Sequence, residues 1–328
     1  MREKQFQQIC VIGSINADLT VRAARLPKPG ESVAGGPLQV LPGGKSANQA
    51  AAAGRLGATV SLVGMVGDDS NGEMLLRSLS ANGVRTTSVG CAENIATGTA
   101  MITVDDQGEN FIIASPGANG MVGPDLVDAH VDLIESCGVL GLTFEVPMAA
   151  NIRAAEIAAN CGTQVVLNPS PFKHPPAELL RHVDVLVVNE HEFGLLLPNS
   201  DLRGDITDSA RFLAAQGVRS VVITLGSRGA GVLFTGLAEG GAAGEPRYAE
   251  IAAPKVDAID TTGCGDAFTG SLMLGLATGQ ELADSVRTAC AVGAYAATSL
   301  GAQSSYPDSE QLAVFLASQP ALAGATGL

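Results

Sequence analysis

The stretch IDTTGCGDAF, residues 259–268, is the most informative part of the chain. It joins a glycine-rich turn to the start of a predicted helix over residues 266–278, whose apolar side chains fall on one face. Such a helix start favours an anion, because its unpaired N–H groups and the helix dipole both attract negative charge. Asp266 has two local interpretations: a helix cap, or a base that takes a proton from a hydroxyl attacking a bound phosphate. A cap alone does not explain the Gly-Cys-Gly sequence that precedes it.

Short apolar runs alternate with helical stretches over most of the remaining chain. The runs are rich in Val, Ile and Leu and do not alternate cleanly with polar residues, as is typical of strands buried on both faces. Strands separated by helices predict parallel βαβ units and an open, doubly wound sheet. The predicted strands are residues 9–12, 60–66, 139–143, 164–167, 183–188, 221–225 and 231–234. The predicted helices are residues 46–56, 72–82, 148–160 and 208–216.

Two segments lack a helix where a crossover helix is expected. One contains β-like pieces over residues 18–21 and 33–40, and the other reads as a hairpin of strands 98–104 and 110–114. We predict a small β-sheet lid over the sheet edge, although two ordinary surface loops are the alternative. The expected division is a lid of residues 17–41 and 97–114 and a large α/β domain of residues 1–16, 42–96 and 115–328. From residue 318 onward the sequence predicts no regular structure.

Composition excludes several classes of protein. The 328 residues contain 19 Lys and Arg against 33 Asp and Glu, a net charge of −14, which disfavours nucleic-acid binding. A hydrophobic content of 46% is incompatible with wholesale disorder. Without an apolar run of about 18 residues or a signal-peptide pattern, we expect no membrane span and a cytoplasmic protein. The six cysteines form no CxxC pair and no metal-ligand spacing with the four histidines, so reduced thiols are expected.

Polar residues follow most of the predicted strands, at the edge where open α/β sheets bind ligands. Any one of them is more typically a turn former, but together they predict a site. They are Asn16 and Asp18, Glu145, Asn168, Asn189 and Glu192, and the turn TLGSRG at 224–229. Two tempting motifs fail: GGKS at 43–46 lacks the first glycine of a P-loop, and the late GCG at 263–265 lacks the third glycine of a dinucleotide fingerprint.

The stretches GGKSANQA at 43–50 and DTTGCGD at 260–266 resemble the two signatures of the PfkB-type carbohydrate kinase family. GSINAD at 13–18 and GAQSS at 301–305 are similar to the ribokinase branch of that family, and the likeness runs from Ile9 to about Leu316. The resemblance implies a ribokinase-like three-layer sandwich, with a mostly parallel doubly wound sheet and a β-sheet lid. It also implies ATP as phosphoryl donor, Mg²⁺, activation by a monovalent cation such as K⁺, and a homodimer joined through the lids.

The resemblance further implies roles for individual residues. The sugar-binding set is Asn16, Asp18, Gly44, Lys45, Asn48 and Glu145. The nucleotide-binding set is Asn189, Thr224, Gly226, Ser227, Gly229, Gly265 and Cys290. Glu192 is implied to order Mg²⁺, partly through water. The monovalent-cation set is Asp260, Thr262, Ala296, Ser299, Gly301 and Ser305. Catalysis is implied for Asp266 as the base, with an anion hole formed by Gly263, Cys264 and Gly265.

The expected reaction converts ATP and D-ribose to ADP and ribose 5-phosphate. The alternatives are another kinase of the family (a deoxyribokinase, fructokinase or nucleoside kinase) and a non-catalytic sugar sensor. A nucleoside kinase calls for an aromatic stack on the base, and Phe111 is the one aromatic residue of the hairpin. An intact Asp266 argues against the sensor. Ser46 stands where ribokinases commonly have Gly, so it either narrows the sugar pocket or caps the helix.

Overall fold

A computed structural model describes residues 5–197, 206–237 and 244–319. Ten strands form one large sheet in the order β14-β13-β12-β11-β10-β9-β1-β4-β5, with β6 also paired to β4. The sheet is parallel except where β13 pairs with β12 and β14. Its strands are β1 (Gln5–Ile12), β4 (Thr59–Gly67), β5 (Val84–Arg85), β6 (Val89–Ala92), β9 (Cys137–Thr143), β10 (Gln164–Asn168), β11 (Val185–Asn189), β12 (Ser220–Thr224), β13 (Ala230–Phe234) and β14 (Arg247–Ile251).

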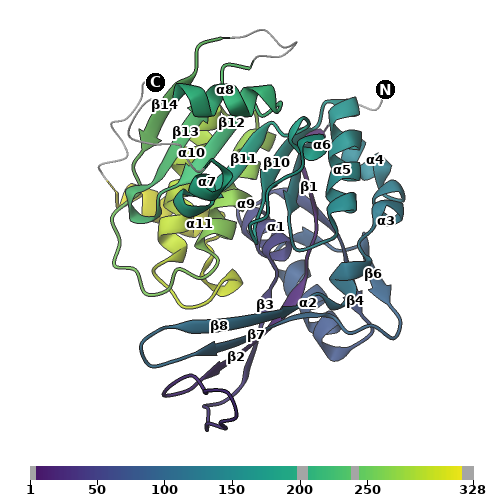
Figure 1. The fold of residues 1–328 in the computed structure, drawn as a ribbon, viewed down its shortest axis with the longest axis vertical. Coiled ribbons are helices and arrows are strands. Elements are labelled where there is room, and N and C mark those ends of the chain that lie inside the picture. The colour runs from purple at the N-terminus through teal and green to yellow at the C-terminus, as the bar shows by residue number, and fades with distance from the viewer. Residues whose placement is uncertain (1–4, 198–205, 238–243, 320–328) are drawn as a thin grey trace.

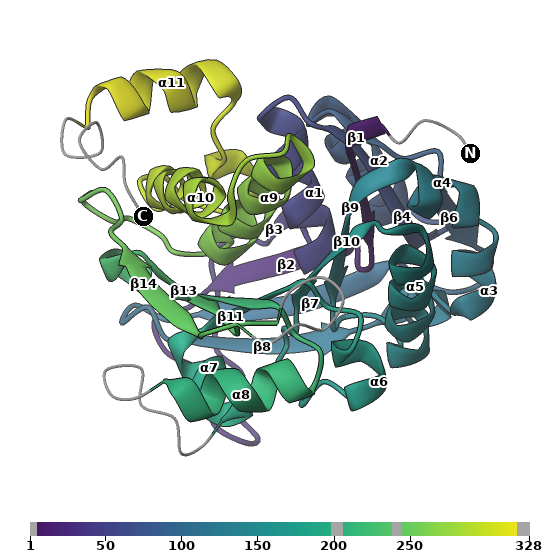
Figure 2. The ribbon, with the colours of Figure 1, turned by 90° about the horizontal axis from the view of Figure 1, so that it is seen from above.

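Helices cover both faces of this sheet, which makes three layers (Figure 2). One face carries α1 (Lys45–Arg55), α2 (Ser70–Ala81), α9 (Cys264–Ala277) and α10 (Leu282–Ala296), with α11 (Ser309–Ala317) packed outside α10. The other carries α3 (Pro124–Asp128), α4 (Val131–Ser136), α5 (Met148–Cys161), α6 (Ala177–Leu180), α7 (Glu190–Leu196) and α8 (Thr207–Ala215). Three 3₁₀ turns complete the described chain: η1 (Gly117–Met121), η2 (Gly226–Arg228) and η3 (Gln303–Ser305).

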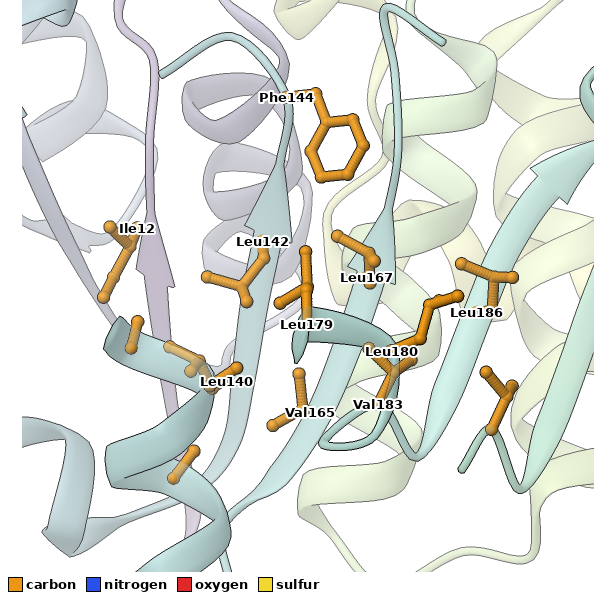
Figure 3. Close-up of a cluster of buried hydrophobic side chains, with 14 of the residues drawn as sticks. Ile12, Leu140, Leu142, Phe144, Val165, Leu167, Leu179, Leu180, Val183 and Leu186 are labelled. Atoms are coloured by element: carbon orange, nitrogen blue, oxygen red, sulfur yellow. The ribbon is translucent and has the colours of Figure 1, made fainter. Parts of the chain in front are cut away.

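Burial on both faces explains why the strand sequences do not alternate with polar residues. In β1, Ile9 and Val11 pack against α1 and α9, whereas Cys10 and Ile12 pack into the opposite core. None of these four side chains is exposed. Figure 3 shows this opposite core, in which Leu142 lies between Ile12 of β1 and the side chains of Leu167 and Leu179.

A second sheet of four strands, in the order β3-β2-β7-β8, projects from one end of the large sheet (Figure 1). Its strands are β2 (Asn16–Arg22), β3 (Gln39–Gly43), β7 (Gly98–Val104) and β8 (Asn110–Ser115). The predicted hairpin is therefore confirmed. The predicted strand over residues 33–40 is wrong for most of its length, because only an isolated bridge at Gly35 precedes β3. The sequence Gly35-Gly36-Pro37 interrupts it, since glycine weakens a strand and proline cannot donate to a ladder.

Element boundaries also differ from the prediction at the most informative stretch. Helix α9 begins at Cys264 rather than Asp266, because Gly263 takes a left-handed conformation with φ of 73° and starts the helix earlier. Strand β14 and helices α7 and α11 were absent from the predicted elements. In the described ranges, no helix combines the length and the apolar character needed to cross a membrane. Residues 320–328 of the tail predicted to lack regular structure lie outside the described residues.

Candidate active site

The start of α9 presents backbone N–H groups to a cleft. Within the described residues, the N–H groups of Gly263, Gly265 and Asp266 have no hydrogen-bond acceptor, whereas Cys264 N–H donates to the Thr261 carbonyl at 3.2 Å. A Cβ atom on Gly263 would lie 2.6 Å from the Tyr306 hydroxyl, so only glycine fits this turn. Unpaired donors at a helix start form a site suited to a phosphate or a developing oxyanion.

Asp266 is the third residue of α9 and does not cap it, so the helix-cap interpretation is wrong. Its buried carboxylate instead accepts one hydrogen bond on each oxygen. Asn48 Nδ2 donates to Oδ2 at 3.0 Å, and Gln49 Nε2 donates to Oδ1 at 3.3 Å. Burial raises the pKa of Asp266 above its ordinary value, against the lowering effect of Lys45 and the two amides. A carboxylate with a raised pKa is a stronger base, as proton abstraction near neutral pH requires.

Three carboxylates and one lysine converge beside this helix start. Burial and the charges of Glu145 and Asp266 together raise the pKa of Asp18 from 3.8 to about 7, against the opposing charge of Lys45. Glu145 is fixed through one oxygen, Oε2, which accepts from Ser14 Oγ at 2.5 Å and from the Lys45 N–H at 2.9 Å. The structure thus brings together Asp18, Glu145, Lys45 and Asp266 from four separate segments.

Asn16 begins β2, immediately before this group of charges. Its Oδ1 accepts from Asn119 Nδ2 at 2.7 Å, while Asn119 also bonds the backbone of Ile15 through both ends of its amide. The orientation of the Asn16 amide is therefore set by a residue of η1. Asn119 carried no signal in the sequence analysis, because its partners lie 103 or more positions away.

The two glycines before α1 permit close approach of the backbone to the site. A Cβ atom on Gly43 would lie 2.2 Å from Asp18 Oδ2, and one on Gly44 would lie 2.8 Å from the backbone nitrogen of Asn16. Gly44 is the N-cap of α1, with φ of 90° and no side-chain cap, so the capping interpretation of Ser46 is wrong. The Ser46 hydroxyl is fully buried against Thr143 Oγ1 at 2.8 Å.

A cleft of about 230 Å³ extends from Asp266 along the carboxyl ends of the strands. It is lined by Lys45, Asn168, Ser170, Val187, Val188, Asn189, Glu192, Thr224, Thr261, Gly263, Gly265, Asp266 and Thr269. The structure thus places the predicted phosphate-side residues of β11, β12 and α9 around one opening.

The spacing of Asn189 and Glu192 has a local structural cause. The two residues form a reciprocal capping box on α7: Glu192 N–H donates to Asn189 Oδ1 at 2.7 Å, and Asn189 N–H donates to Glu192 Oε2 at 2.9 Å. The box commits one oxygen of Glu192 and fixes the direction of its carboxylate at the cleft.

The turn after β12 contains the predicted nucleotide-binding residues Gly226, Ser227 and Gly229. Gly229 has φ of 109°, and a Cβ atom there would lie 2.0 Å from the Ile251 carbonyl oxygen, so glycine is required. Ser227 is exposed within η2. Cys290 is buried nearby; burial raises the pKa of its thiol to about 12, so it is an apolar contact rather than a reactive group.

Asp260 joins two loops that carry the predicted monovalent-cation residues. Its carboxylate accepts from the Thr262 N–H at 2.9 Å and the Gly301 N–H at 2.8 Å. Burial opposes ionisation, but these two donors outweigh it and lower the pKa of Asp260. Buried Ala296 ends α10, exposed Ser299 follows it, and the Ser305 hydroxyl donates to the Ala302 carbonyl at 2.8 Å.

The sequence analysis missed three further residues that support Asp266 and its helix. Gln49 and Gln303 lie within the two quoted stretches at 43–50 and 301–305, but no role was assigned to them. Tyr306 directly follows the second stretch, and its buried hydroxyl donates to the Gly263 carbonyl at 3.1 Å.

Comparison with known proteins settles the family. The model of the pfkB family of carbohydrate kinases matches residues 7–309. The chain belongs to this family. It is 38% identical over 309 residues to the ribokinase of Schizosaccharomyces pombe, covering 91% of this chain and 94% of the relative. It is also 31% identical over 310 residues to the deoxyribokinase of Salmonella typhi, covering 94% and 98%.

Solved structures of the family confirm the predicted ribokinase-like sandwich. Arabidopsis thaliana ribokinase complexed with ribose and ATP matches with a TM-score of 0.86 at 30% identity, covering 94% of this chain and 98% of that one. The predicted resemblance and fold class are therefore both correct.

Proposed function

We propose that this chain is an ATP-dependent ribose kinase that converts D-ribose to ribose 5-phosphate. The observation that carries the proposal is the buried Asp266 carboxylate, placed beside unpaired N–H groups and next to a second group of carboxylates. The names of the relatives favour ribose over other sugars, since the ribokinase of Schizosaccharomyces pombe is more similar than the deoxyribokinase of Salmonella typhi.

In the proposed mechanism, Asp266 accepts the proton of the sugar hydroxyl as the oxygen attacks the γ-phosphorus. The bond from that phosphorus to the bridging oxygen breaks, and ADP leaves. The N–H groups of Gly263 and Gly265 and the Lys45 ammonium stabilise the charged phosphoryl oxygens, so catalysis rests on positioning and electrostatics. Since Cys264 N–H already has an acceptor, it contributes only if the Thr261 turn rearranges.

Recognition of ribose rests on groups that pair with its hydroxyls. Asp18 and Glu145 supply acceptors, and the amides of Asn16 and Asn48 supply acceptors and donors. A sugar with a misplaced hydroxyl leaves such groups unpaired, which is costly in a buried site. Gly44 lets the chain approach closely enough for these contacts.

The residues fit both implied metal ions. The capping box uses Oε2 of Glu192, so its other oxygen, Oε1, suits contact to Mg²⁺ through water. When bound, Mg²⁺ neutralises phosphate charge. In the described ranges, no three His, Cys, Asp or Glu side chains are grouped as a metal site, so Glu192 would hold Mg²⁺ together with water and the phosphates of ATP. The ionised Asp260 and the oxygen-rich loop around Gly301 suit a monovalent cation such as K⁺.

We assign the small sheet, residues 17–41 and 97–114, as a lid that covers the sugar. Asp18 lies on the face toward Glu145 and Asp266, with Leu41 and Ala100 beside it in register. The opposite face carries an apolar row, in which Val40, Leu19, Met101 and Ile113 follow one another across the four strands. Such a row suits a second copy of the chain and hence a homodimer. The six cysteines, none of which forms a disulfide in the described part of the chain, and the use of ATP fit a cytoplasmic enzyme.

The test is ADP release from Mg-ATP with ribose, deoxyribose, fructose and adenosine, with and without K⁺. We expect turnover that depends on ribose and is raised by K⁺. Asp266→Asn should keep ATP binding and lose kcat by about 10²–10⁴-fold, because the base is removed. Asp125→Asn, at an exposed position on α3 outside the lid, is the matched control, with unchanged kcat expected. Turnover on another acceptor alone would refute ribose as the substrate, and normal turnover by Asp266→Asn would refute the base.

A further inference from the structure

A chain of side-chain amides runs through the buried side of the site and ends at Asp266 from two directions. On one side, Asn168 Nδ2 donates to the Val187 carbonyl at 2.9 Å, and its Oδ1 accepts from Gln49 Nε2 at 3.3 Å. The same Gln49 nitrogen donates to Asp266 Oδ1. On the other side, Gln303 Nε2 donates to Asn48 Oδ1 at 3.0 Å.

The order of donors and acceptors along these hydrogen-bonded amides determines which end of the Asn48 amide faces Asp266. An amide presents an oxygen at one end and a nitrogen at the other. Because the Gln303 nitrogen occupies the Asn48 oxygen, the Asn48 nitrogen must point the other way, toward Asp266 Oδ2. If Gln303 could not donate, a rotated Asn48 would turn its oxygen toward the carboxylate, and Asp266 would lose a donor.

Gln303 is well held for this task. It is 5% exposed, it lies in η3, and its Oε1 is 3.5 Å from Ser78 Oγ as the acceptor of a long hydrogen bond. It lies 255 positions from Asn48 and in the same loop as Gly301, whose N–H binds Asp260. The loop after α10 is therefore connected to the Asp266 carboxylate through the amides of Gln303 and Asn48.

We propose that Gln303 is a positioning residue for the phosphoryl transfer, which acts through Asn48 to keep an N–H donor on Asp266. It touches neither the reacting hydroxyl nor the phosphate. This inference rests on the proposed function, in which Asp266 is the base. The effect of Gln303 on Asp266 must pass through Asn48.

The decisive experiment is a double-mutant cycle of Gln303→Met and Asn48→Ala, read as kcat on ribose at saturating Mg-ATP. Gln303→Met should lower kcat about three- to tenfold, the effect of one buried hydrogen bond, with the KM for ATP unchanged. In the Asn48→Ala background it should have no further effect, because its only route to Asp266 is gone. Gln311→Met, an exposed glutamine in the capping box of α11, is the matched control and should leave kcat unchanged.

A second readout does not depend on turnover. The carboxyl carbon of Asp266, labelled with ¹³C and assigned with Asp266→Asn, reports its pKa by NMR titration. Loss of the Asn48 donor should raise the pKa of Asp266 in Gln303→Met and leave it unchanged in the control. The other groups that act on Asp266 are present in both proteins: Lys45, Glu145, Asp18, Cys264 and Tyr306.

The outcomes separate the two proposals. Additive losses of kcat in the cycle, or an unchanged pKa of Asp266 in Gln303→Met, would overturn the role of Gln303. If the wild-type protein phosphorylates no sugar, the proposed function fails, and the NMR titration still decides whether Gln303 orients the amide. If Gln303→Met does not fold, Gln303→Leu replaces it, since an uncharged apolar side chain also cannot donate to Asn48.

Discussion

At the scale of single residues, the buried carboxylate of Asp18 lowers the stability of the folded protein when it ionises. Its carboxylate is packed against Gly43 and lies near Glu145 and Asp266, and burial with these like charges raises its pKa from 3.8 to about 7. The folded protein therefore holds the Asp18 proton more tightly than the unfolded chain. Ionisation of Asp18 costs folding free energy, and this cost grows as the pH rises from about 4 to 7.

Asp18→Asn should therefore stabilise the protein in the absence of sugar while it abolishes ribose binding. The neutral amide resembles the protonated acid, so the gain should increase between about pH 5 and 7 and level off above pH 7. We expect a gain on the order of 2 kcal/mol at pH 8, measured by urea unfolding across this pH range. The exposed Asp106→Asn is the control. A gain that does not vary with pH, or a loss at pH 8, would contradict the titration of Asp18.

At the scale of elements, the start of α9 is held by the side chain of Tyr306, which follows α10 in the sequence. The Gly263 carbonyl accepts from the Ala267 N–H at 2.8 Å and also from the Tyr306 hydroxyl at 3.1 Å. Tyr306 is 1% exposed, and its backbone carbonyl accepts from Arg55 of α1 at 2.7 Å. The turn that presents the Gly263 and Gly265 N–H groups is thus braced against α1.

Tyr306→Phe should lower kcat about three- to tenfold with a loss of only about 1 kcal/mol in unfolding free energy. The small loss is expected because the Ala267 N–H still pairs the Gly263 carbonyl, whereas the turn loses its external support. Steady-state kinetics and urea unfolding measure the two effects. Tyr295→Phe on α10, where the ring packs edge-on against Phe315, serves as the control. Equal kcat values for the two variants would show that the hydroxyl does not position the turn.

At the scale of the whole molecule, one face of the small sheet is turned toward the site, and the opposite face carries the apolar row. The site side carries Asp18, whereas the other side exposes Val40 (43%), Met101 (47%) and Ile113 (65%) in one row. Contiguous exposed apolar side chains mark an interaction surface. A second copy of the chain would cover this row and hold the lid.

Ile113→Glu should convert the proposed dimer to a monomer, because a charge on the most exposed side chain of the apolar row cannot be buried without a partner. Sedimentation equilibrium at about 10 µM chain, on the order of ordinary dimer affinities, measures the change. Phe212→Glu, an equally apolar exposed position on α8 (50% exposed), is the control and should remain a dimer. A wild-type monomer, or a dimer that survives Ile113→Glu, would refute this interface.

Local sequence determined the central strands of the large sheet, helices α1, α2, α5, α8 and α9, and the chemistry of the α9 start. Runs such as residues 139–143 are apolar enough to predict burial on both faces, and the glycines around Cys264 predict a tight turn before a helix. These features depend on neighbours within a few positions, which is why the sequence alone predicts them. The strand predicted over residues 33–40 failed for a local reason as well, the Gly-Gly-Pro interruption.

Only the tertiary structure determined what surrounds Asp266. The bonds from Gln49 to Asp266 and from Gln303 to Asn48 span 217 and 255 positions, and no local preference predicts them. The raised pKa values of Asp18 and Asp266 likewise arise from burial and from charges on other segments. The sequence therefore predicted Asp266 as the base and the helix start beside it, whereas packing of distant segments decided which amides bond to its carboxylate, because hydrogen bonding and desolvation depend on proximity in space.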